Sequence, residues 1–405
     1  MQTGDIAELE ISGVAHGGVF IARHGEAGFV VFVPDVLPGE RVLARITQVK
    51  KSFARAEVLE VLDASPHRVP HIWRQASIDR PPELRPGGAD FGHIELGHQR
   101  ELKTRVLTEA FDRFAGGSVR TAVEAVPGDE RGVRWRTRVG LHVDGSGRVG
   151  PFAARSHDVI DVADHPLATV GIERVALGLG REKPGRIDLV QPADGEVRVL
   201  RRPDDRRRGR GPRPAPEVVI ERVAEREFRV DADGFWQVHH GAAAALDRAV
   251  REALAGIEPD DDAHHLDLYG GVGLFAAALA ERGGRVTTVE SSPRATQHAR
   301  DNLADLGVEA VTARVERFVE QLPADPALAG GVTLLDPPRA GAGEQVVTRI
   351  ADLGPRAVVY VACDPVALAR DVGIFRRLGY DLDAVRGIDL FPGSHHVEAV
   401  AVLRR

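Results

Sequence analysis

Cysteine is almost absent from this chain of 405 residues, which contains one, Cys363. A single thiol excludes a disulfide within the chain, and it excludes a zinc or iron–sulfur site built from several thiolates. Apolar runs of about 18 residues, long enough to cross a membrane, are also missing. The N-terminal sequence MQTGDIAELE is acidic, unlike a secretory signal. We therefore expect a soluble cytoplasmic protein with no membrane contact, no metal and no iron–sulfur cluster.

An excess of positive charge is missing as well, because the formal net charge is −7. The molecule as a whole is therefore not a basic nucleic-acid binder. A local basic groove stays possible, since affinity for phosphates depends on the patch and not on the total charge. With 43% hydrophobic residues, the chain has enough apolar material for about two to four domains with a large core.

Residues 1–62 alternate apolar and polar side chains between glycines and prolines, a pattern that predicts a small β-barrel. The predicted strands are Ile6–Ile11, Gly18–Arg23, Gly28–Val33, Arg41–Val49 and Phe53–Val61. Small barrels of this kind often bind oligonucleotides, and Arg23, Lys50, Lys51 and Arg55 are the candidate contacts. The solvated surface of an accessory domain explains these four residues equally well.

Residues 63–232 have a mixed pattern. A proline- and arginine-rich segment is followed by a predicted helix within 92–116, where apolar residues recur at helical spacing. Predicted strands at 134–144 and 148–154 open a β-rich region. The segment Leu200–Glu217 is rich in arginine and proline and has no periodicity. We interpret it as a mobile surface loop, because a basic loop of this type is more often a solvated linker than an RNA contact.

From residue 233, short apolar strands alternate with helical patterns, which predicts an α/β domain with a doubly wound, mostly parallel sheet. A ligand is then expected at the carboxyl ends of the strands. The glycine turn LDLYGGVG follows one strand and Glu290 ends the next, an arrangement that suits the ribose of a dinucleotide or of S-adenosylmethionine (SAM). The rigid loop LLDPPRAG, with Asp336, favours SAM, because hydride transfer has no use for such a loop.

Cys363 lies between an apolar strand and a helix that Asp364 is suited to cap. The positive end of a helix is expected to lower the pKa of a thiol beside it. By itself, however, a lone cysteine at such a position is more often a small buried apolar residue than a reactive one.

Six short segments, in order, resemble the motifs of the RNA uracil-5 methyltransferase family. The family consists of class I, SAM-dependent enzymes that form 5-methyluridine in tRNA or rRNA. The segments are FWQVHHGAAAAL, LDLYGGVG, VESSPRA, LLDPPRAG, YVACDP and FPGSHHVEAVAVL. The resemblance implies a cofactor and substrate site formed by Gln237, Tyr269, Glu290 and Asp336. It further implies that Cys363 is the nucleophile and Glu398 the general base.

The resemblance also extends to the rest of the chain. Residues 1–62 resemble the TRAM domain, an OB-like RNA-binding barrel, and RWRTRVGLHV resembles a strand of the family's RNA-binding insert. The implied domains are the TRAM barrel at 1–62, a linker, helix and central β-rich RNA-binding region at 63–232, and a Rossmann-like methyltransferase domain at 233–405. The implied partner is rRNA or tRNA.

The chemistry implied for this family explains why one cysteine suffices. A thiolate attacks carbon 6 of the uracil, carbon 5 then takes the methyl group of SAM, and a base removes the carbon-5 proton. Cys363, Glu398 and a positioned donor cover these needs. The histidines His395 and His396 lie beside Glu398 in the sequence, and we assign them no role.

The sequence departs from the family pattern in three places. Pro86 and Ala89 stand where cluster-bearing members have thiols, and Gly270 replaces a common cysteine, a change that we expect to be harmless. Ala362 and Asp364 replace Ser and Asn around the nucleophile, and the charge of Asp364 is expected to raise the pKa of the thiol. Two alternatives therefore stay open: a non-catalytic RNA-binding paralogue, and a SAM methyltransferase that acts on a different base or a small molecule.

Overall fold

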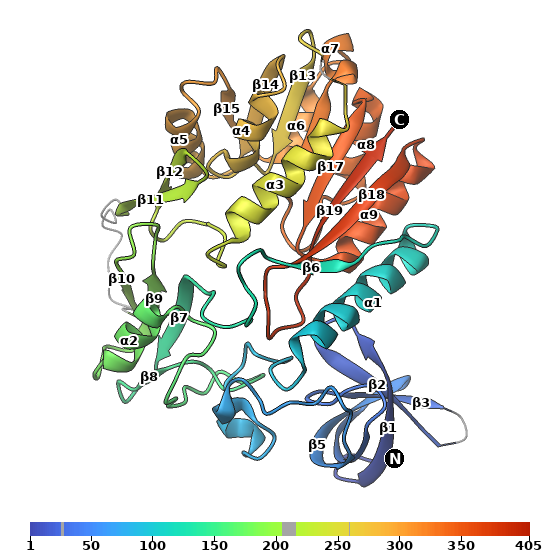
Figure 1. The fold of residues 1–405 in the computed structure, drawn as a ribbon, viewed down its shortest axis with the longest axis vertical. Coiled ribbons are helices and arrows are strands. Elements are labelled where there is room, and N and C mark those ends of the chain that lie inside the picture. Colours follow the sequence, from blue (N-terminus) through green and yellow to red (C-terminus); the bar gives the residue numbers. More distant parts are fainter. Residues whose placement is uncertain (26–27, 205–215, 259) are drawn as a thin grey trace.

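A closed five-stranded barrel forms the N-terminal end of the molecule (blue in Figure 1) in a computed structural model that describes residues 1–25, 28–204, 216–258 and 260–405. Its strands are β1 (Ile6–Ala15), β2 (Val19–His24), β3 (Phe29–Val33), β4 (Arg41–Val49) and β5 (Phe53–Asp63). Alternate residues of β4, namely Val42, Ala44 and Ile46, are buried inside the barrel. The barrel prediction is confirmed, because the inward and outward alternation of a strand is visible in its sequence.

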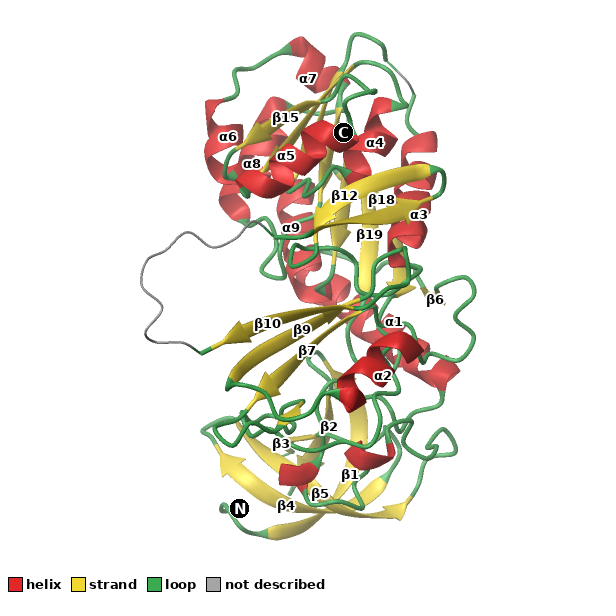
Figure 2. Ribbon diagram, turned by 90° about the vertical axis from the view of Figure 1, so that its left-hand side faces the viewer, coloured by secondary structure: helices red, strands yellow, loops and turns green. Residues whose placement is uncertain are grey.

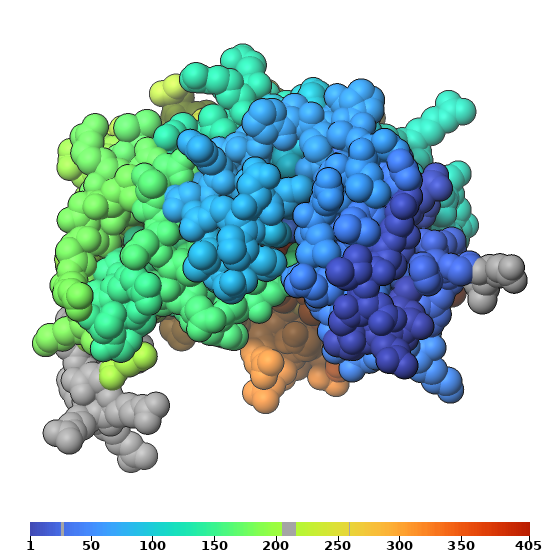
Figure 3. Space-filling model, turned by 90° about the horizontal axis from the view of Figure 1, so that it is seen from below, coloured from blue at the N-terminus to red at the C-terminus, as the bar shows by residue number. Residues whose placement is uncertain are grey.

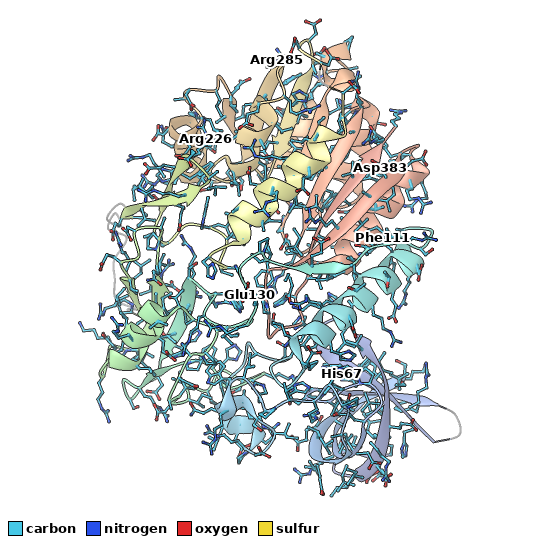
Figure 4. All side chains as sticks on the ribbon, viewed as in Figure 1. His67, Phe111, Glu130, Arg226, Arg285 and Asp383 are labelled. Carbon is cyan, nitrogen blue, oxygen red and sulfur yellow. The ribbon has the colours of Figure 1, made fainter. Side chains whose placement is uncertain are left out.

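The helix α1 (Leu96–Phe114) connects the barrel to the C-terminal domain. Its N-terminus is capped by the carboxylate of Glu95, which accepts hydrogen bonds from two backbone N–H groups of the first turn. Leu102 on α1 belongs to the core of the barrel, whereas Phe111, labelled in Figure 4, belongs to a core of the C-terminal domain. The short strand β6 (Val123–Ala125) then pairs with the edge of the C-terminal sheet. Parts of the 63–232 segment are thus integral to the C-terminal domain.

The central region contains a second, antiparallel sheet in the order β10-β9-β7-β8 and a separate hairpin. Its elements are two 3-10 turns (Arg74–Ala76 and Pro82–Leu84), β7 (Arg138–Val143), β8 (Val149–Gly150), α2 (Val170–Gly178), β9 (Gly185–Val190), β10 (Arg198–Pro203), β11 (Val218–Val223) and β12 (Arg226–Asp231). The strands predicted within 134–154 are confirmed as β7 and β8.

The prediction of a loop over Leu200–Glu217 is wrong at its start. The strand β10 continues to Pro203 and pairs with β9 along its whole length. Edge strands tolerate charged residues and a terminal proline. Arg201 on β10 forms an ion pair with Glu182, which belongs to the loop before β9. Residues 205–215 lie outside the described part of the chain.

The C-terminal domain has an eight-stranded sheet in the order β15-β14-β13-β16-β17-β19-β18-β6, with helices on both faces. The strands are β13 (His264–Leu268), β14 (Arg285–Glu290), β15 (Glu309–Thr312), β16 (Val332–Leu335), β17 (Ala357–Ala362), β18 (Asp381–Asp389) and β19 (Glu398–Arg404). The helices are α3 (Ala242–Ala255), α4 (Leu274–Ala280), α5 (Pro293–Asn302), α6 (Val315–Gln321), α7 (Pro326–Gly330), α8 (Glu344–Leu353) and α9 (Pro365–Arg377).

Strand direction determines where the catalytic candidates meet. β13 to β17 are mutually parallel, whereas β19 runs antiparallel to β17. The first residues of β19 therefore lie beside the last residues of β17, with Ala399 opposite Ala362. The strand order reverses between β13 and β16, which is where a sheet of this type binds its ligand. The predicted doubly wound, mostly parallel sheet is confirmed.

The carboxyl ends of these strands face the barrel and the central region. Figure 2 shows the C-terminal domain at one end, the barrel at the other, and the β7–β9–β10 sheet between them. Viewed from below, the barrel in dark blue and the central region in green cover much of the C-terminal domain (Figure 3). None of the helices within the described residues is long and apolar enough to span a bilayer. In the same residues, no group of three or more His, Cys, Asp or Glu side chains is arranged to hold a metal ion.

Candidate active site

Cys363 follows the last residue of β17, a strand that is buried along its full length. The thiol itself is partly exposed. Asp364 caps α9, because its Oδ1 accepts hydrogen bonds from the backbone N–H groups of Val366 (3.0 Å) and Ala367 (2.8 Å). Pro365 occupies the first helical position, where a missing N–H has no cost. The strand, cap and helix around Cys363 are as predicted.

The thiol does not have the lowered pKa that the helix end by itself predicted, and the causes of its raised pKa are other than Asp364. Burial raises the pKa of Cys363 to about 11, with further contributions from the negative charges of Glu398 and Asp336, while Arg339 acts in the opposite direction. The loss of water around the thiol thus outweighs the favourable helix end. Asp364 directs its two oxygens elsewhere, toward the backbone of α9 and toward His16.

Glu398 is the first residue of β19 and is 4% exposed. Burial raises the pKa of this carboxyl group well above its ordinary value, Asp336 raises it further and Arg339 opposes the shift. Burial therefore shifts the equilibrium of this carboxyl group toward its protonated form. A buried carboxyl group that has a raised pKa and lies close to a thiol is a candidate for proton transfer.

Asp336 follows β16, and its backbone N–H donates to the carbonyl of Leu268 at the end of β13 (3.3 Å). Burial, and then the charge of Asp267, raises its pKa to about 7. Asp267 on β13 is fully buried; its Oδ2 accepts from Thr288 Oγ1 (2.7 Å), whereas its Oδ1 has no hydrogen-bond partner among the residues that the structure describes. Two carboxyl groups with raised pKa values thus lie at the switch point of the sheet.

Sequence reasoning gave no role to Arg339, although it lies in the same DPPR motif as Asp336. Its guanidinium lowers the pKa of both Cys363 and Glu398, and it approaches Nε2 of His396 at 3.4 Å. Burial lowers the pKa of His396 to about 4, so its imidazole is neutral. A cation three residues after the strand-end carboxylate was the signal available in the sequence.

The glycine turn and Glu290 lie together, as expected. Glu290 Oε2 accepts from the backbone N–H of Gly271 (3.2 Å), and its Oε1 accepts from that of Ser292 (2.7 Å). Tyr269, at the start of the turn, has a left-handed backbone (φ 65°) and is half-buried. Burial raises the pKa of its phenol, so it remains neutral.

Gly270 occupies a position that leaves no room for a side chain. A Cβ at this position would overlap Thr288 Oγ1 and Asp267 Oδ2, so a cysteine does not fit unless this hydrogen-bonded pair moves. At Gly271, by contrast, a Cβ would meet nothing within 4 Å. Open space at the turn, next to an oriented acid at the end of β14, fits the ribose and methionine parts of SAM.

Gln237 lies in the segment between β12 and α3 and is half-buried. Its neighbour Val238 is held by Thr137, whose backbone N–H (2.7 Å) and Oγ1 (3.0 Å) both donate to the Val238 carbonyl. No hydrogen bond of the Gln237 side chain occurs among the described residues. The structure therefore brings Tyr269, Glu290, Asp336, Cys363 and Glu398 to one edge of the sheet, whereas a place for Gln237 in the site stays a prediction.

Comparisons with known proteins agree with this architecture. Residues 1–59 match the TRAM domain, and residues 247–377 match the family described as "Conserved hypothetical protein 95". A protein of Streptomyces avermitilis, described as an uncharacterized RNA methyltransferase, is 39% identical, with 99% of this chain and 98% of that protein aligned. The 23S rRNA (uracil(1939)-C(5))-methyltransferase RlmD of Chromohalobacter salexigens is 31% identical, with 98% and 89% of the two chains aligned.

A solved structure has the same fold over almost the whole chain. It is the Pyrococcus abyssi tRNA (uracil-54, C5)-methyltransferase in complex with S-adenosyl-L-homocysteine. The TM-score is 0.68 at 22% identity, with 98% of this chain and 99% of that chain covered. Together with the relatives above, the fold and the motif order show that this chain belongs to the SAM-dependent RNA uracil-5 methyltransferase family.

Proposed function

We propose that this protein transfers the methyl group of SAM to carbon 5 of a uracil in rRNA or tRNA, with Cys363 as the nucleophile and Glu398 as the general base. The observation that carries the proposal is the convergence of both side chains at the junction of β17 and β19. The electrostatic effect of Glu398 and Asp336 on the pKa of Cys363, and of Asp336 on that of Glu398, supports their proximity. Gln237, Tyr269, Glu290 and Asp336 are the proposed cofactor and substrate contacts.

In the proposed mechanism, Cys363 gives its proton to solvent and its Sγ bonds to carbon 6 of the uracil, so that the electron pair of the carbon 5–carbon 6 double bond moves to carbon 5 and the ring carbonyl. SAM, when bound at the glycine turn, supplies the methyl group that carbon 5 takes. The carboxylate of Glu398 then removes the proton from carbon 5, and the bond between Sγ and carbon 6 breaks. Positive charge beside the thiol favours the thiolate, and Arg339 is placed to supply it.

The remaining parts of the chain are proposed to hold the RNA. Residues 1–62 and 63–232 would bind the RNA, and residues 233–405 would bind SAM. A base must leave its stack to reach a thiol at the sheet edge, at a cost of a few kcal/mol that is smallest in single-stranded RNA. Contacts between the RNA and the barrel would offset this cost.

Mass-spectrometric mapping of 5-methyluridine in total rRNA and tRNA from deletion and parent strains tests the substrate. One site of 5-methyluridine should be lost in the deletion strain and restored by the wild-type gene but not by C363A. Identical maps would refute the substrate assignment. Methyl transfer at the wild-type rate by C363A would instead establish a methyltransferase of another class.

Purified protein tests the chemistry directly. E398Q should accumulate a covalent protein–RNA adduct that resists denaturing electrophoresis, because the thiol adds but the carbon-5 proton stays. C363A should form no adduct. Calorimetric titration with SAM separates an enzyme from a non-catalytic RNA-binding paralogue, which predicts no SAM binding.

A further inference from the structure

The turn between β1 and β2 of the barrel reaches the edge of the C-terminal sheet. His16 in this turn is 348 residues from Asp364 in the sequence, yet its Nε2 lies 2.9 Å from Asp364 Oδ2. The hydrogen bond and the charge of Asp364 raise the pKa of His16, while partial burial opposes the shift. A protonated Nε2 therefore donates to the carboxylate, and the pair joins two domains.

Asp364 is directly bonded to the residue proposed as the nucleophile. Its Oδ1 accepts from two N–H groups of α9 and its Oδ2 accepts from His16, so both oxygens are held. The side chain of Asp364 is 21% exposed and that of His16 is 44% exposed. The backbone from Cys363 into α9 is thus held from one side by the helix and from the other by the barrel.

Through Gly18, the same turn also packs against a hydrogen-bonded pair, Asp90 and His395, in front of Glu398. Asp90 Oδ2 accepts from the backbone N–H of His395 (3.1 Å) and lies 2.6 Å from His395 Nδ1. Gly18 (φ +73°) packs against this pair: a Cβ there would overlap Asp90 Oδ2 and lie 2.7 Å from His395 Nδ1. His395 precedes Glu398 by three residues. The turn therefore touches the segments of both proposed catalytic residues.

We propose that the β1–β2 turn of the barrel is a positioning element of the methyl-transfer site, in which His16 orients Cys363 through Asp364 and Gly18 supports the segment of Glu398 through Asp90 and His395. This inference rests on the proposed function and adds to it. It gives the barrel a role in arranging the catalytic groups, besides any contact with RNA. It also assigns a purpose to Asp364, whose carboxylate links His16 to the first turn of α9.

The first experiment compares H16A, H16Q and the control H24A in methyl transfer. His24 is a histidine of the same barrel, but it lies at the far end of β2, about 17 Å along the strand from the turn. H24A therefore removes the same type of side chain from the same domain without touching the turn. H16A should lower kcat about tenfold or more with little change in KM for RNA, because a small displacement of the nucleophile is costly. H16Q should restore most of kcat, since a glutamine amide also donates to Asp364. A rise in KM alone, or equal rates for H16A and H24A, would refute the proposal.

The second experiment needs neither RNA nor SAM. Because Cys363 is the only cysteine, its alkylation by iodoacetamide at pH 8 reports on this thiol alone. Besides Asp364, the charged groups around it are Glu398, Asp336 and Arg339. H16A should lower the alkylation rate about threefold or more, because an Asp364 carboxylate that is no longer held by His16 can turn toward the thiolate and repel it, whereas H24A should not. An unchanged or increased rate in H16A contradicts the coupling. Were the wild type to lack methyl transfer altogether, the proposed function would fail while this measurement still decided the coupling.

Gly17 and Gly18 provide a matched pair for the other contact. Both have a positive φ, +90° and +73°, but a Cβ at Gly17 meets nothing within 4 Å. The two alanine variants therefore share the backbone strain and differ in the contact with Asp90 and His395. G18A should lower kcat by a further factor of about ten or more relative to G17A, with equal helix content by circular dichroism. Equal kcat values for the two variants would remove Gly18 from the proposal.

Discussion

Replacing Lys103 with methionine should destabilise the protein strongly. Lys103 on α1 is 1% exposed, and its Nζ lies 2.5 Å from Asp389 Oδ1 and 3.0 Å from the carbonyl oxygen of Phe391. Asp389 is also 1% exposed, and within the described part of the chain its Oδ2 has no hydrogen-bond partner. In K103M the apolar stem is kept, but the buried carboxylate loses its cation. Such a loss costs about 3–5 kcal/mol of unfolding free energy.

The same helix contains the control. Arg105 and Glu109 form an exposed pair at 2.7 Å, with side chains 50% and 52% exposed. R105M should therefore lower the free energy of unfolding by less than about 0.5 kcal/mol. Urea unfolding monitored by circular dichroism measures both variants, and K103M/D389L should recover much of the loss, since the unpaired charge is then gone. A cost for K103M below about 1 kcal/mol would refute the reasoning.

K103M should also affect catalysis, because the ion pair lies at the start of the segment that leads to Glu398. Gln99, one turn earlier on α1, holds the same segment by accepting from the backbone N–H of Gly393 (2.8 Å). At a temperature where K103M is still folded, kcat should be lower than in R105M. Equal kcat values would mean that the pair supports the fold and not the position of Glu398.

Three further results are expected. Burial raises the pKa of Asp267 from 3.8 to about 7, so between these pH values the native state keeps a proton that the unfolded state loses. The free energy of unfolding of the wild type should therefore fall as the pH rises through this range, by up to about 4 kcal/mol relative to D267N. Urea unfolding at a series of pH values measures this difference. G270A should bind SAM about tenfold more weakly or worse in calorimetry, because its Cβ overlaps Thr288, while G271A should stay nearer to the wild type. The rate of alkylation of wild-type Cys363 should rise about tenfold per pH unit toward its pKa of about 11, and a plateau below pH 9 would contradict the burial effect.

The sequence alone was sufficient wherever the physical cause is local. The alternation of β4 predicted both of its ends, and the apolar run of β17 followed by Asp364 and Pro365 predicted a strand, a cap and a helix. Parallel strands bring their carboxyl ends to one edge, so motifs at strand ends were expected to meet although they are far apart in the chain. The order of the motifs then indicated the family.

Only the tertiary structure decided what depends on burial and on contacts between distant segments. β10 continues into the arginine-rich segment because β9 offers it a pairing partner. In the same way, β6 joins the C-terminal sheet because it pairs with β18. The pKa of Cys363 rises, against the local prediction, because desolvation and the carboxyl groups of other strands outweigh the helix end. From the sequence, Asp364 was expected to be an unfavourable charge beside the thiol. In the fold, His16 of the barrel lies within hydrogen-bond distance of it. Sequence patterns record the neighbours of a residue along the chain, whereas acidity and charge compensation are determined by its neighbours in space.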